Sequence, residues 1–294
     1  MARRIKVHSA SLIGKRDDNQ DSELSLVNLD KNGNSILKVY NPIDLFIICD
    51  GHGGSGVSNI VSTMLYNIIS QEKFSFPISN GTIRVIYNSI QNYLIEDHKE
   101  LATNCGSTAI VVIRFFDKEH NMEKLQVINL GDCRIVLSRN GLPLPLSKDH
   151  KPSWPEERLR INNVNSIYGR NDKVVFEQGD WRIHGLSVSR GFGDLSATPH
   201  VSSSPESLTH DIRDKDEFII VACDGLWDVL QNHEAVNFVK DHMENDTQIY
   251  YIPRRYPNKE SNSTTCIATK LAHYAIARGS GDNISLYIVF FYKK

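Results

Sequence analysis

With 294 residues, of which 40% are hydrophobic and 23% charged, the chain has the composition of a globular protein. Its net charge of -2 argues against a broad nucleic-acid surface, and no apolar run approaches the roughly 20 residues that a membrane span requires. The N-terminal residues contain no hydrophobic signal segment, so we expect a cytoplasmic or nuclear protein that does not bind membranes.

Five cysteines are present, at positions 49, 105, 133, 223 and 266. Their odd number, and the position of three of them in or beside strand-like apolar runs, indicate reduced thiols that fill the core. No CxxC pair and no Cys/His spacing typical of a zinc site occurs in the sequence.

The first half of the chain predicts a polar loop, a buried strand and two helices. The charged loop is 16–21 (RDDNQD). The apolar run 45–49 ends abruptly at Asp50 and a glycine-rich turn (DGHGG), which is the pattern of a buried strand. Hydrophobic residues at helical spacing then predict two amphipathic, core-packing helices over 57–69 and 83–94.

The second half predicts mainly strands. Residues 149–181 are polar and irregular, with one expected helix at 156–161, and such a long insert is typical of a functional lid.

Two helices followed by a strand meander indicate an α+β fold rather than alternating βαβ units. Further strands are expected over 107–116, 125–130, 134–137, 217–223 and 284–291, helices over 234–243 and 267–278, a hairpin turn at 31–34 and a surface loop at 246–263.

Four aspartates stand beside glycines at the ends of strand-like runs: Asp50, Asp132, Asp224 and Asp282. One such residue is commonplace in a turn, but four suggest that several strands deliver carboxylates to one place. A carboxylate at the edge of a buried strand is held rigidly, as a catalytic or metal site requires. Neighbouring glycine lets the backbone approach an ion or a phosphate. Ordinary Asp-Gly turns are the alternative.

Eight segments, in the same order, resemble those of the type 2C metal-dependent serine/threonine protein phosphatases (PPM-type). They are RDDNQD from Arg16, DGHGG from Asp50, GSTA from Gly106, NLGDCR from Asn129, LSKDHKP from Leu146, LSVSRGFGD from Leu186, CDGLWDVL from Cys223 and GDNIS from Gly281. The resemblance implies a four-layer αββα sandwich, with two mainly antiparallel sheets between helix layers. It also implies one catalytic domain over 1–294, with its core over 8–292 and a flap over 149–181.

The resemblance further implies a site for two metal ions. Asp50 would bridge the ions, and the carbonyl of Gly51 would bind one of them. Asp224 and Asp282 would complete the shell of the other ion, and Asp21 would lie in the metal shell, partly through water. All are oxygen donors, which suits Mg²⁺ or Mn²⁺ better than zinc.

Other matched positions imply the remaining roles. Arg16 would hold the substrate phosphate with its planar guanidinium. His52 would be the general acid that protonates the departing serine or threonine oxygen. Asp132 and Asp228 correspond to the acids that, together with Asp224, hold a third and weaker ion in some members.

The implied reaction is the hydrolysis of phosphoserine and phosphothreonine in proteins, as part of signalling. A water that bridges the two ions would attack phosphorus, so no nucleophilic serine or cysteine is required. The partners would be phosphorylated protein substrates rather than nucleic acid, and we expect a monomer, since the sequence shows no coiled-coil pattern.

Some positions depart from the family pattern or carry expectations of their own. Gln20 stands where many members have glutamate, and Asn165-Ser166 stands where a glycine pair is common. Arg190 and Asp194 are expected to pair and fix the base of the flap. Asp228 is four residues after Asp224 and could instead cap the following helix.

Two alternatives to the phosphatase hypothesis stay open. A non-catalytic member would use the fold as a binding module, and it should have lost ligand aspartates, which this sequence retains. Another two-metal hydrolase, such as a nuclease, should show a basic groove with aromatic residues for stacking. Apart from Arg254-Arg255 and the short basic start, the sequence shows no such stretch.

Overall fold

Two five-stranded sheets lie at the centre of the computed structural model, which describes residues 3–28, 43–71, 74–243 and 266–292. The long apolar runs of the sequence become strands that are covered on both faces. In β3 (Ile43–Cys49) every residue is buried, and in β14 (Asp216–Ala222) every residue but Glu217. All strand pairs within the two sheets are antiparallel.

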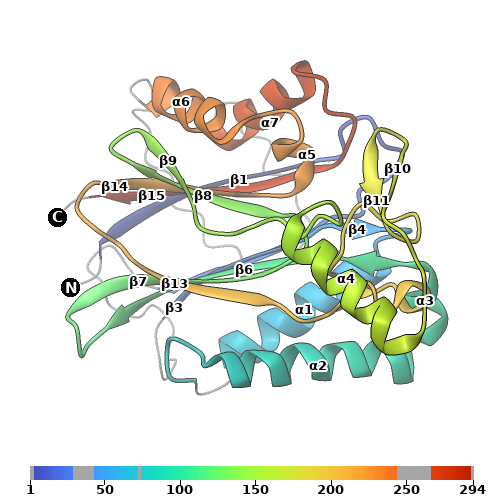
Figure 1. Cartoon of the computed structure of the whole chain (residues 1–294). Helices are drawn as coiled ribbons and strands as arrows, with labels where there is room; N and C mark the ends of the chain where they lie inside the picture. The colour runs from blue at the N-terminus through green and yellow to red at the C-terminus, as the bar shows by residue number, and fades with distance from the viewer. Residues whose placement is uncertain (1–2, 29–42, 72–73, 244–265, 293–294) are drawn as a thin grey trace.

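The first sheet has the order β1-β15-β14-β8-β9 and the second has the order β13-β7-β6-β3-β2 (Figure 1). In the first sheet, β1 pairs with β15 in a register that runs from Arg4 opposite Tyr292 to Leu12 opposite Ile284. The remaining bounds are β1 (Arg4–Leu12), β2 (Ser22–Val27), β6 (Ala109–Asp117), β7 (Met122–Leu130), β8 (Arg134–Arg139), β9 (Leu142–Pro145), β13 (Glu206–Asp211) and β15 (Ile284–Tyr292).

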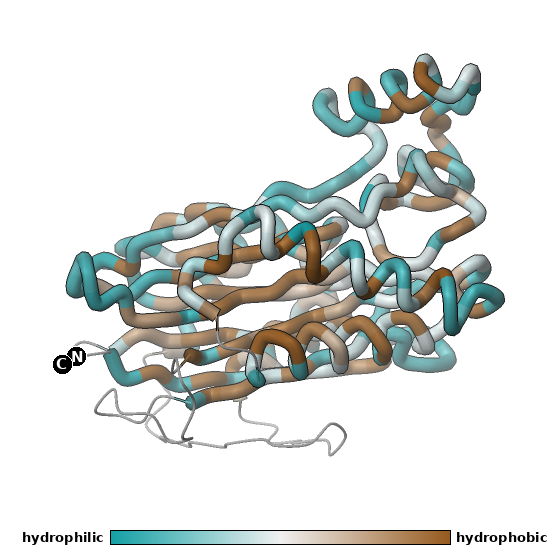
Figure 2. The backbone as a smooth tube through the Cα atoms, turned by 90° about the horizontal axis from the view of Figure 1, so that it is seen from below, coloured by the Kyte–Doolittle hydropathy of each residue, from teal (hydrophilic) through white to brown (hydrophobic). Residues whose placement is uncertain are grey.

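Helices cover the outer faces of both sheets, so the molecule has four layers (Figure 1). The helices α1 and α2 share one hydrophobic cluster with the second sheet, and α6 and α7 share another with the first. A third cluster, which includes Phe46 and Ile219, fills the space between the sheets. Figure 2 shows the corresponding runs of hydrophobic residues along the strands. The bounds are α1 (Gly56–Gln71), α2 (Asn80–Asp97), α6 (Asn232–Met243) and α7 (Ile267–Ala277).

This architecture confirms the α+β prediction and the four-layer αββα sandwich. Among the described residues, no helix is long and apolar enough to cross a membrane. All five cysteines are free, as expected. The hairpin turn expected at 31–34 and the loop expected at 246–263 lie outside the described residues.

Short elements complete the end of the sandwich at which β3 and β14 finish. A small antiparallel sheet has the order β12-β5-β4. Its strands are β4 (Gly51–His52), β5 (Gly106–Ser107) and β12 (Phe192–Gly193), and the short helices are α3 (Lys99–Asn104), α5 (Asp224–Trp227) and the 3-10 helix η1 (Leu195–Ala197).

The flap is more regular than its sequence indicates. Its helix, α4 (Pro155–Tyr168), is longer than the expected 156–161 and ends at Gly169 in the left-handed conformation (φ 63°). Asn165-Ser166 therefore lies inside a helix and forms no turn. A hairpin of β10 (Val175–Glu177) and β11 (Asp180–Arg182) follows. The full length of the helix was not apparent because α4 has few apolar residues, and the two strands are only three residues long.

The expected pair of Arg190 with Asp194 is wrong. Arg190 instead binds Glu157 of α4, with its Nε 2.9 Å from Oε1. The other carboxylate oxygen of Glu157 accepts hydrogen bonds from Ser189 Oγ (2.7 Å) and Arg160 Nε (3.0 Å). The flap base is thus fixed by a buried carboxylate on the helix, and Asp194 is free to contact His52.

Glu157 should make a pH-dependent contribution to stability. Burial alone would raise its pKa, but Arg190 and Arg160 outweigh burial and lower it from 4.5 to about 2. A depressed pKa stabilises the folded state above pH 4.5, and this contribution is lost as the pH falls from 4.5 towards 2. We expect Glu157→Gln to lower the free energy of unfolding by about 3 kcal/mol at pH 7, with the difference shrinking below pH 4.5.

Urea unfolding of both proteins at pH 7, 5 and 3.5 measures this difference. The matched control is Glu156→Gln, because Glu156 is 67% exposed and lies 3.7 Å from Lys148 Nζ. A Glu157→Gln effect that does not change with pH would contradict the assignment.

Candidate active site

Acidic side chains from both sheets meet at one end of the sandwich. Asp50 directly follows β3, and Asp224 begins α5, with only Cys223 between it and the end of β14. Asp21 immediately precedes β2, the neighbour of β3. One ligating atom from each of Asp21, Asp50 and Cys223 lies within 4.8 Å of the other two. The packing of one sheet on the other therefore makes neighbours of residues that are far apart in the sequence.

Burial and mutual repulsion raise the pKa of these carboxyl groups. For Asp50 the main cause is burial, and the charges of Asp21 and Asp224 raise its pKa further, well above the usual range. Burial and the charges of Asp132 and Asp228 raise the pKa of Asp224 in the same way. Burial also raises the pKa of Asp21, to about 6. Keeping these groups ionised together costs free energy unless a cation lies among them.

One asparagine holds the loop that precedes β2. Asn283 Nδ2 donates hydrogen bonds to the carbonyl oxygens of Ile13 (2.8 Å) and Asp18 (2.9 Å). Its Oδ1 accepts a hydrogen bond from the backbone N–H of Gln20 (2.9 Å). The loop that carries Arg16 is thereby tied to the turn before β15.

Arg16 lies beside Asp282 at the rim of the acidic cluster. Its Nη2 donates to Asp282 Oδ2 at 2.8 Å, and its side chain is 56% exposed. The charge of Asp282 also contributes to the raised pKa of Asp50, although less than burial does. The residue predicted to bind phosphate and a residue predicted to bind metal therefore contact each other.

Gln20 takes part in the backbone packing around Gly51. Its Oε1 accepts a hydrogen bond from the N–H of Gly54 (3.2 Å), and its carbonyl oxygen accepts one from Ser58 Oγ (2.5 Å). A Cβ atom on Gly51 would overlap that same carbonyl oxygen. The predicted ligand Gly51 is thus a position where two backbone segments touch, which only glycine allows.

His52 pairs with Asp194 across the small sheet. His52 Nε2 lies 2.8 Å and 2.9 Å from the two carboxylate oxygens of Asp194. Gly106 of β5 pairs with His52 on one side and with Gly193 on the other. A Cβ atom on Gly106 would overlap both the Asp194 carboxylate and His52 Nε2. Glycine at this position leaves the space in which the two side chains meet.

The pair with Asp194 changes the titration of His52. Burial alone would lower the pKa of His52, but the hydrogen bond to Asp194 and the charge of Asp194 outweigh burial and raise it. The side chain remains 30% exposed. His52 therefore retains its proton to higher pH than a free histidine, as a proton donor needs.

Lys151 occupies the space beside Asp132, where a third ion was predicted. Its Nζ lies 2.5 Å from Asp132 Oδ2 and 4.0 Å from Asp224 Oδ2. Burial would lower the pKa of Lys151, but the charges of Asp132, Asp224 and Asp228 raise it. Asp132 is 1% exposed, so the ammonium group is its charge partner inside the protein.

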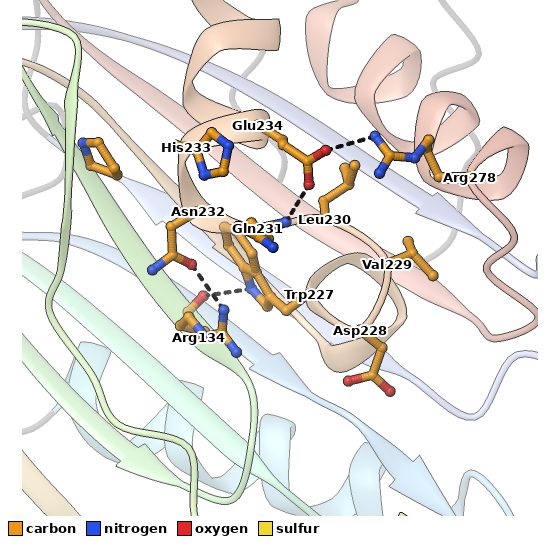
Figure 3. A pocket seen from close by; sticks show the side chains of 11 residues that line it. Arg134, Trp227, Asp228, Val229, Leu230, Gln231, Asn232, His233, Glu234 and Arg278 are labelled. Carbon is orange, nitrogen blue, oxygen red and sulfur yellow. Dashed lines mark hydrogen bonds and ion pairs between the residues drawn. The ribbon is translucent and has the colours of Figure 1, made fainter. Parts of the chain in front are cut away.

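Asp228 lies at the edge of a separate pocket of about 580 Å³, next to α5 and α6 (Figure 3). Its backbone N–H donates to the carbonyl of Asp224, and it is the last residue of α5's final turn rather than a cap of α6. The arginines that line the pocket are already paired, Arg278 with Glu234 (2.8 Å) and Arg134 with Asp149 (2.6 Å). The pocket therefore offers no free cation of its own among the described residues that line it.

The acidic cluster fits a hard divalent cation. Its donors are carboxylate oxygens, and Asp21 Oδ2 is buried without a hydrogen-bond partner among the described residues. Burial raises the pKa of the thiols of Cys49 and Cys223, so both are protonated and neither offers a thiolate. Oxygen donors without thiolate favour Mg²⁺ or Mn²⁺ over softer metals.

Comparison with known proteins agrees with this arrangement. Residues 6–284 match the protein phosphatase 2C family. The chain belongs to this family. The matched segment contains Asp21, Asp50, Asp224 and Asp282, so the acidic cluster lies wholly within the phosphatase 2C region.

Several relatives are similar to this chain, which spans about half to two thirds of the length of most of the plant proteins that it matches. A PP2C-like domain-containing protein of Acanthamoeba polyphaga mimivirus is 56% identical over 177 residues, which are 60% of this chain and 99% of that protein. Probable protein phosphatase 2C 11 of Arabidopsis thaliana is 35% identical over 96% of this chain, and the match spans 65% of the plant protein. The serine-threonine phosphatase 2C structure from Toxoplasma gondii shares the fold, with a TM-score of 0.71, 19% identity, and coverage of 99% of this chain and 96% of that one.

Three residues with evident roles in this site were not assigned from the sequence. They are Lys151, Asp194 and Asn283, and each lies inside one of the segments that carry the resemblance. Their position in these segments was the signal in the sequence that could have identified them. Their partners, however, are 19 to more than 200 residues away, so spacing could not reveal the contacts.

Loss of Lys151 should destabilise the protein when no divalent cation is present. Lys151→Met would leave Asp132 buried without its ammonium partner, and removal of one member of a buried pair costs about 3 kcal/mol. Urea unfolding in EDTA measures the change. Lys148→Met is the control, because Lys148 is 65% exposed and should change stability by less than about 0.5 kcal/mol. Equal effects of the two variants would contradict the role of Lys151.

Proposed function

We propose that this chain hydrolyses phosphoserine and phosphothreonine in proteins with the help of two Mg²⁺ or Mn²⁺ ions. The observation that carries the proposal is the cluster of Asp21, Asp50 and Asp224 at one end of the sandwich, three carboxyl groups whose pKa values are raised mainly by burial. Membership in the phosphatase 2C family supports it. Residues 8–292 would act as one catalytic unit, with 149–181 as its flap.

The proposed metal-binding residues are those of the acidic cluster. Asp50 and the carbonyl of Gly51, together with Asp21, Asp224 and Asp282, would hold the two ions. When bound, the ions would lower the pKa of a water and neutralise charge on the phosphoryl oxygens. The other steps fall to side chains of the protein.

Arg16 is proposed to bind the phosphate group. A guanidinium can hold two phosphate oxygens with parallel hydrogen bonds, and that of Arg16 is largely exposed to solvent. Its present partner, Asp282, is itself 38% exposed, so the pair can be exchanged at small cost. A substrate phosphate would replace Asp282 as the partner of Arg16.

His52 is proposed to give a proton to the departing serine or threonine oxygen. Because Nε2 is bonded to Asp194, Nδ1 is the nitrogen that would carry the donated proton. Asp194 acts through His52 and is a positioning residue: it orients the ring and keeps it protonated. A general acid of this kind contributes about 10²- to 10⁴-fold to the rate.

In the resting enzyme, the ammonium group of Lys151 is proposed to occupy the place of a third ion. The ammonium group already neutralises Asp132 at 2.5 Å, and Asp224 lies 4.0 Å from it. Binding of a third ion by Asp132, Asp224 and Asp228 would require Lys151 to move away.

The proposal predicts metal-dependent release of phosphate from a phosphothreonine peptide. We expect turnover with Mn²⁺ or Mg²⁺, none in EDTA, and a loss of about 10³-fold in Asp50→Asn, since metal ions supply several kcal/mol of transition-state stabilisation. Asp97→Asn, an exposed substitution on α2, is the control and should retain full activity.

Other outcomes would each exclude part of the proposal. Folded protein that shows no turnover with any ion would favour a non-catalytic binding module. Turnover that survives EDTA would mean that the aspartates do not form the metal site. Cleavage of single-stranded DNA without phosphopeptide turnover would favour a nuclease.

A second prediction concerns the His52–Asp194 pair. Asp194→Asn should lower kcat by about 10²-fold and shift the alkaline limb of the kcat–pH profile to lower pH, because the pKa of His52 falls when the carboxylate is removed. Asp211→Asn, on the edge strand β13, is the control. A lower kcat with an unchanged pH profile would indicate a structural role alone.

A further inference from the structure

Three potential metal ligands meet at the base of the flap, away from the acidic cluster. Asp172 lies between α4 and β10, His184 follows β11, and His200 follows η1. One ligating atom of each lies within 4.8 Å of those of the other two. They are too far apart in the sequence to form a short motif, which is why no zinc-like spacing was visible there.

The two imidazole rings face each other through ring nitrogens. His184 Nε2 lies 3.0 Å from His200 Nδ1. Two nitrogens bound to one tetrahedral metal ion at 2.0–2.1 Å are ~3.3 Å apart, so the observed separation is close to that of a ligand pair. Asp172 Oδ1 is 3.9 Å from His184 Nε2, which puts a carboxylate beside the same point.

Asn165 orients two of the three ligands. Its Oδ1 accepts a hydrogen bond from His200 Nε2 (2.9 Å), which leaves the lone pair of Nδ1 directed towards His184. Asn165 Nδ2 also donates to the backbone carbonyl of Asp172 (2.8 Å). Metal-ligating histidines typically donate their other ring N–H to an oxygen in this way.

The ring of His200 is fully buried and is held between Asn165 and His184. Arg160 donates a hydrogen bond to the carbonyl oxygen of His200 (2.8 Å), and its positive charge is balanced by Glu157 at 2.9 Å.

We propose that Asp172, His184 and His200 form a binding site for a divalent transition-metal ion of the Zn²⁺ type. Two imidazoles and a carboxylate, with a fourth position open to water, suit Zn²⁺ or Co²⁺ and not Mg²⁺. Asp172 and His184 are both partly exposed, so an ion can enter from solvent. The site does not depend on the phosphatase proposal.

Such an ion would tie the flap to the core. Asp172 and His184 flank the hairpin β10–β11 on its two sides, whereas His200 is a buried residue of the segment that follows η1. The same hairpin carries Asp180, whose Oδ2 lies 3.8 Å from Lys151 Nζ. The flap helix and the hairpin lie at the same end of the sandwich as β4 (Figure 1), so the ion would fix the flap beside the acidic cluster.

The test is calorimetric titration with Zn²⁺ in saturating Mg²⁺, which occupies the oxygen-donor site, together with Co²⁺ absorption spectra. The variants are His184→Asn and Asn165→Ala. Asparagine suits position 184, whose φ is +52°. The matched control is His120→Asn, because His120 is exposed and also faces one aspartate, Asp117, at 2.8 Å.

We expect one Zn²⁺ equivalent in the unmodified protein and in His120→Asn, at least ~10-fold weaker binding in His184→Asn, and 10- to 100-fold weaker binding in Asn165→Ala. The Co²⁺ absorption bands should weaken in the same two variants. No binding, an unchanged isotherm in His184→Asn, or binding that is lost in Asp50→Asn instead would each overturn the proposal. Circular dichroism of each variant verifies that it is folded.

Discussion

The repulsion among Asp21, Asp50 and Asp224 is the constraint on which the rest of the structure depends. Burial raises the pKa of each of them, and the charges of Asp21 and Asp224 raise the pKa of Asp50 further. An arrangement of this kind persists only where the surrounding fold is rigid enough to resist it. The strands β3 and β14, almost wholly buried in two sheets, supply that rigidity. Lys151 supplies a positive charge beside the cluster, 2.5 Å from Asp132.

Positions next to the acids are occupied by residues that let polypeptide segments come close. Gly51 contacts the backbone of Gln20, and Gly106 leaves room for His52 to meet Asp194. Asn283 ties the loop of Arg16 to the last strand through three hydrogen bonds. The geometry of such a site depends on its glycine positions as much as on its functional side chains. For the same reason, small changes beside the acids should matter as much as changes to the acids themselves.

Local signals in the sequence predicted the α+β class and the gathering of strand-end carboxylates, whereas the four-layer sandwich came from the resemblance to the family. An apolar run that stops at Asp50 and glycine indicates a strand end wherever it occurs, and the order of such runs set the fold class. The partner of a charged side chain was not predictable in this way. The expected pair, Arg190 with Asp194, joined residues four apart in the sequence. In the structure Arg190 binds Glu157, and Asp194 binds His52. The helix of the flap was predicted too short because polar residues lie on nearly all sides of it.

The pairing of β1 with β15 also bears on how the protein is made. The first described strand has no neighbour in its sheet other than the last one, and their contacts are separated by almost the whole chain. Such long-range pairing forms slowly and cannot begin before the C-terminal strand has left the ribosome. Arg16, just beyond β1, then meets Asp282, just before β15. A chain whose synthesis stops early would lack this junction, so interrupted translation should release protein that is unable to complete its acidic cluster.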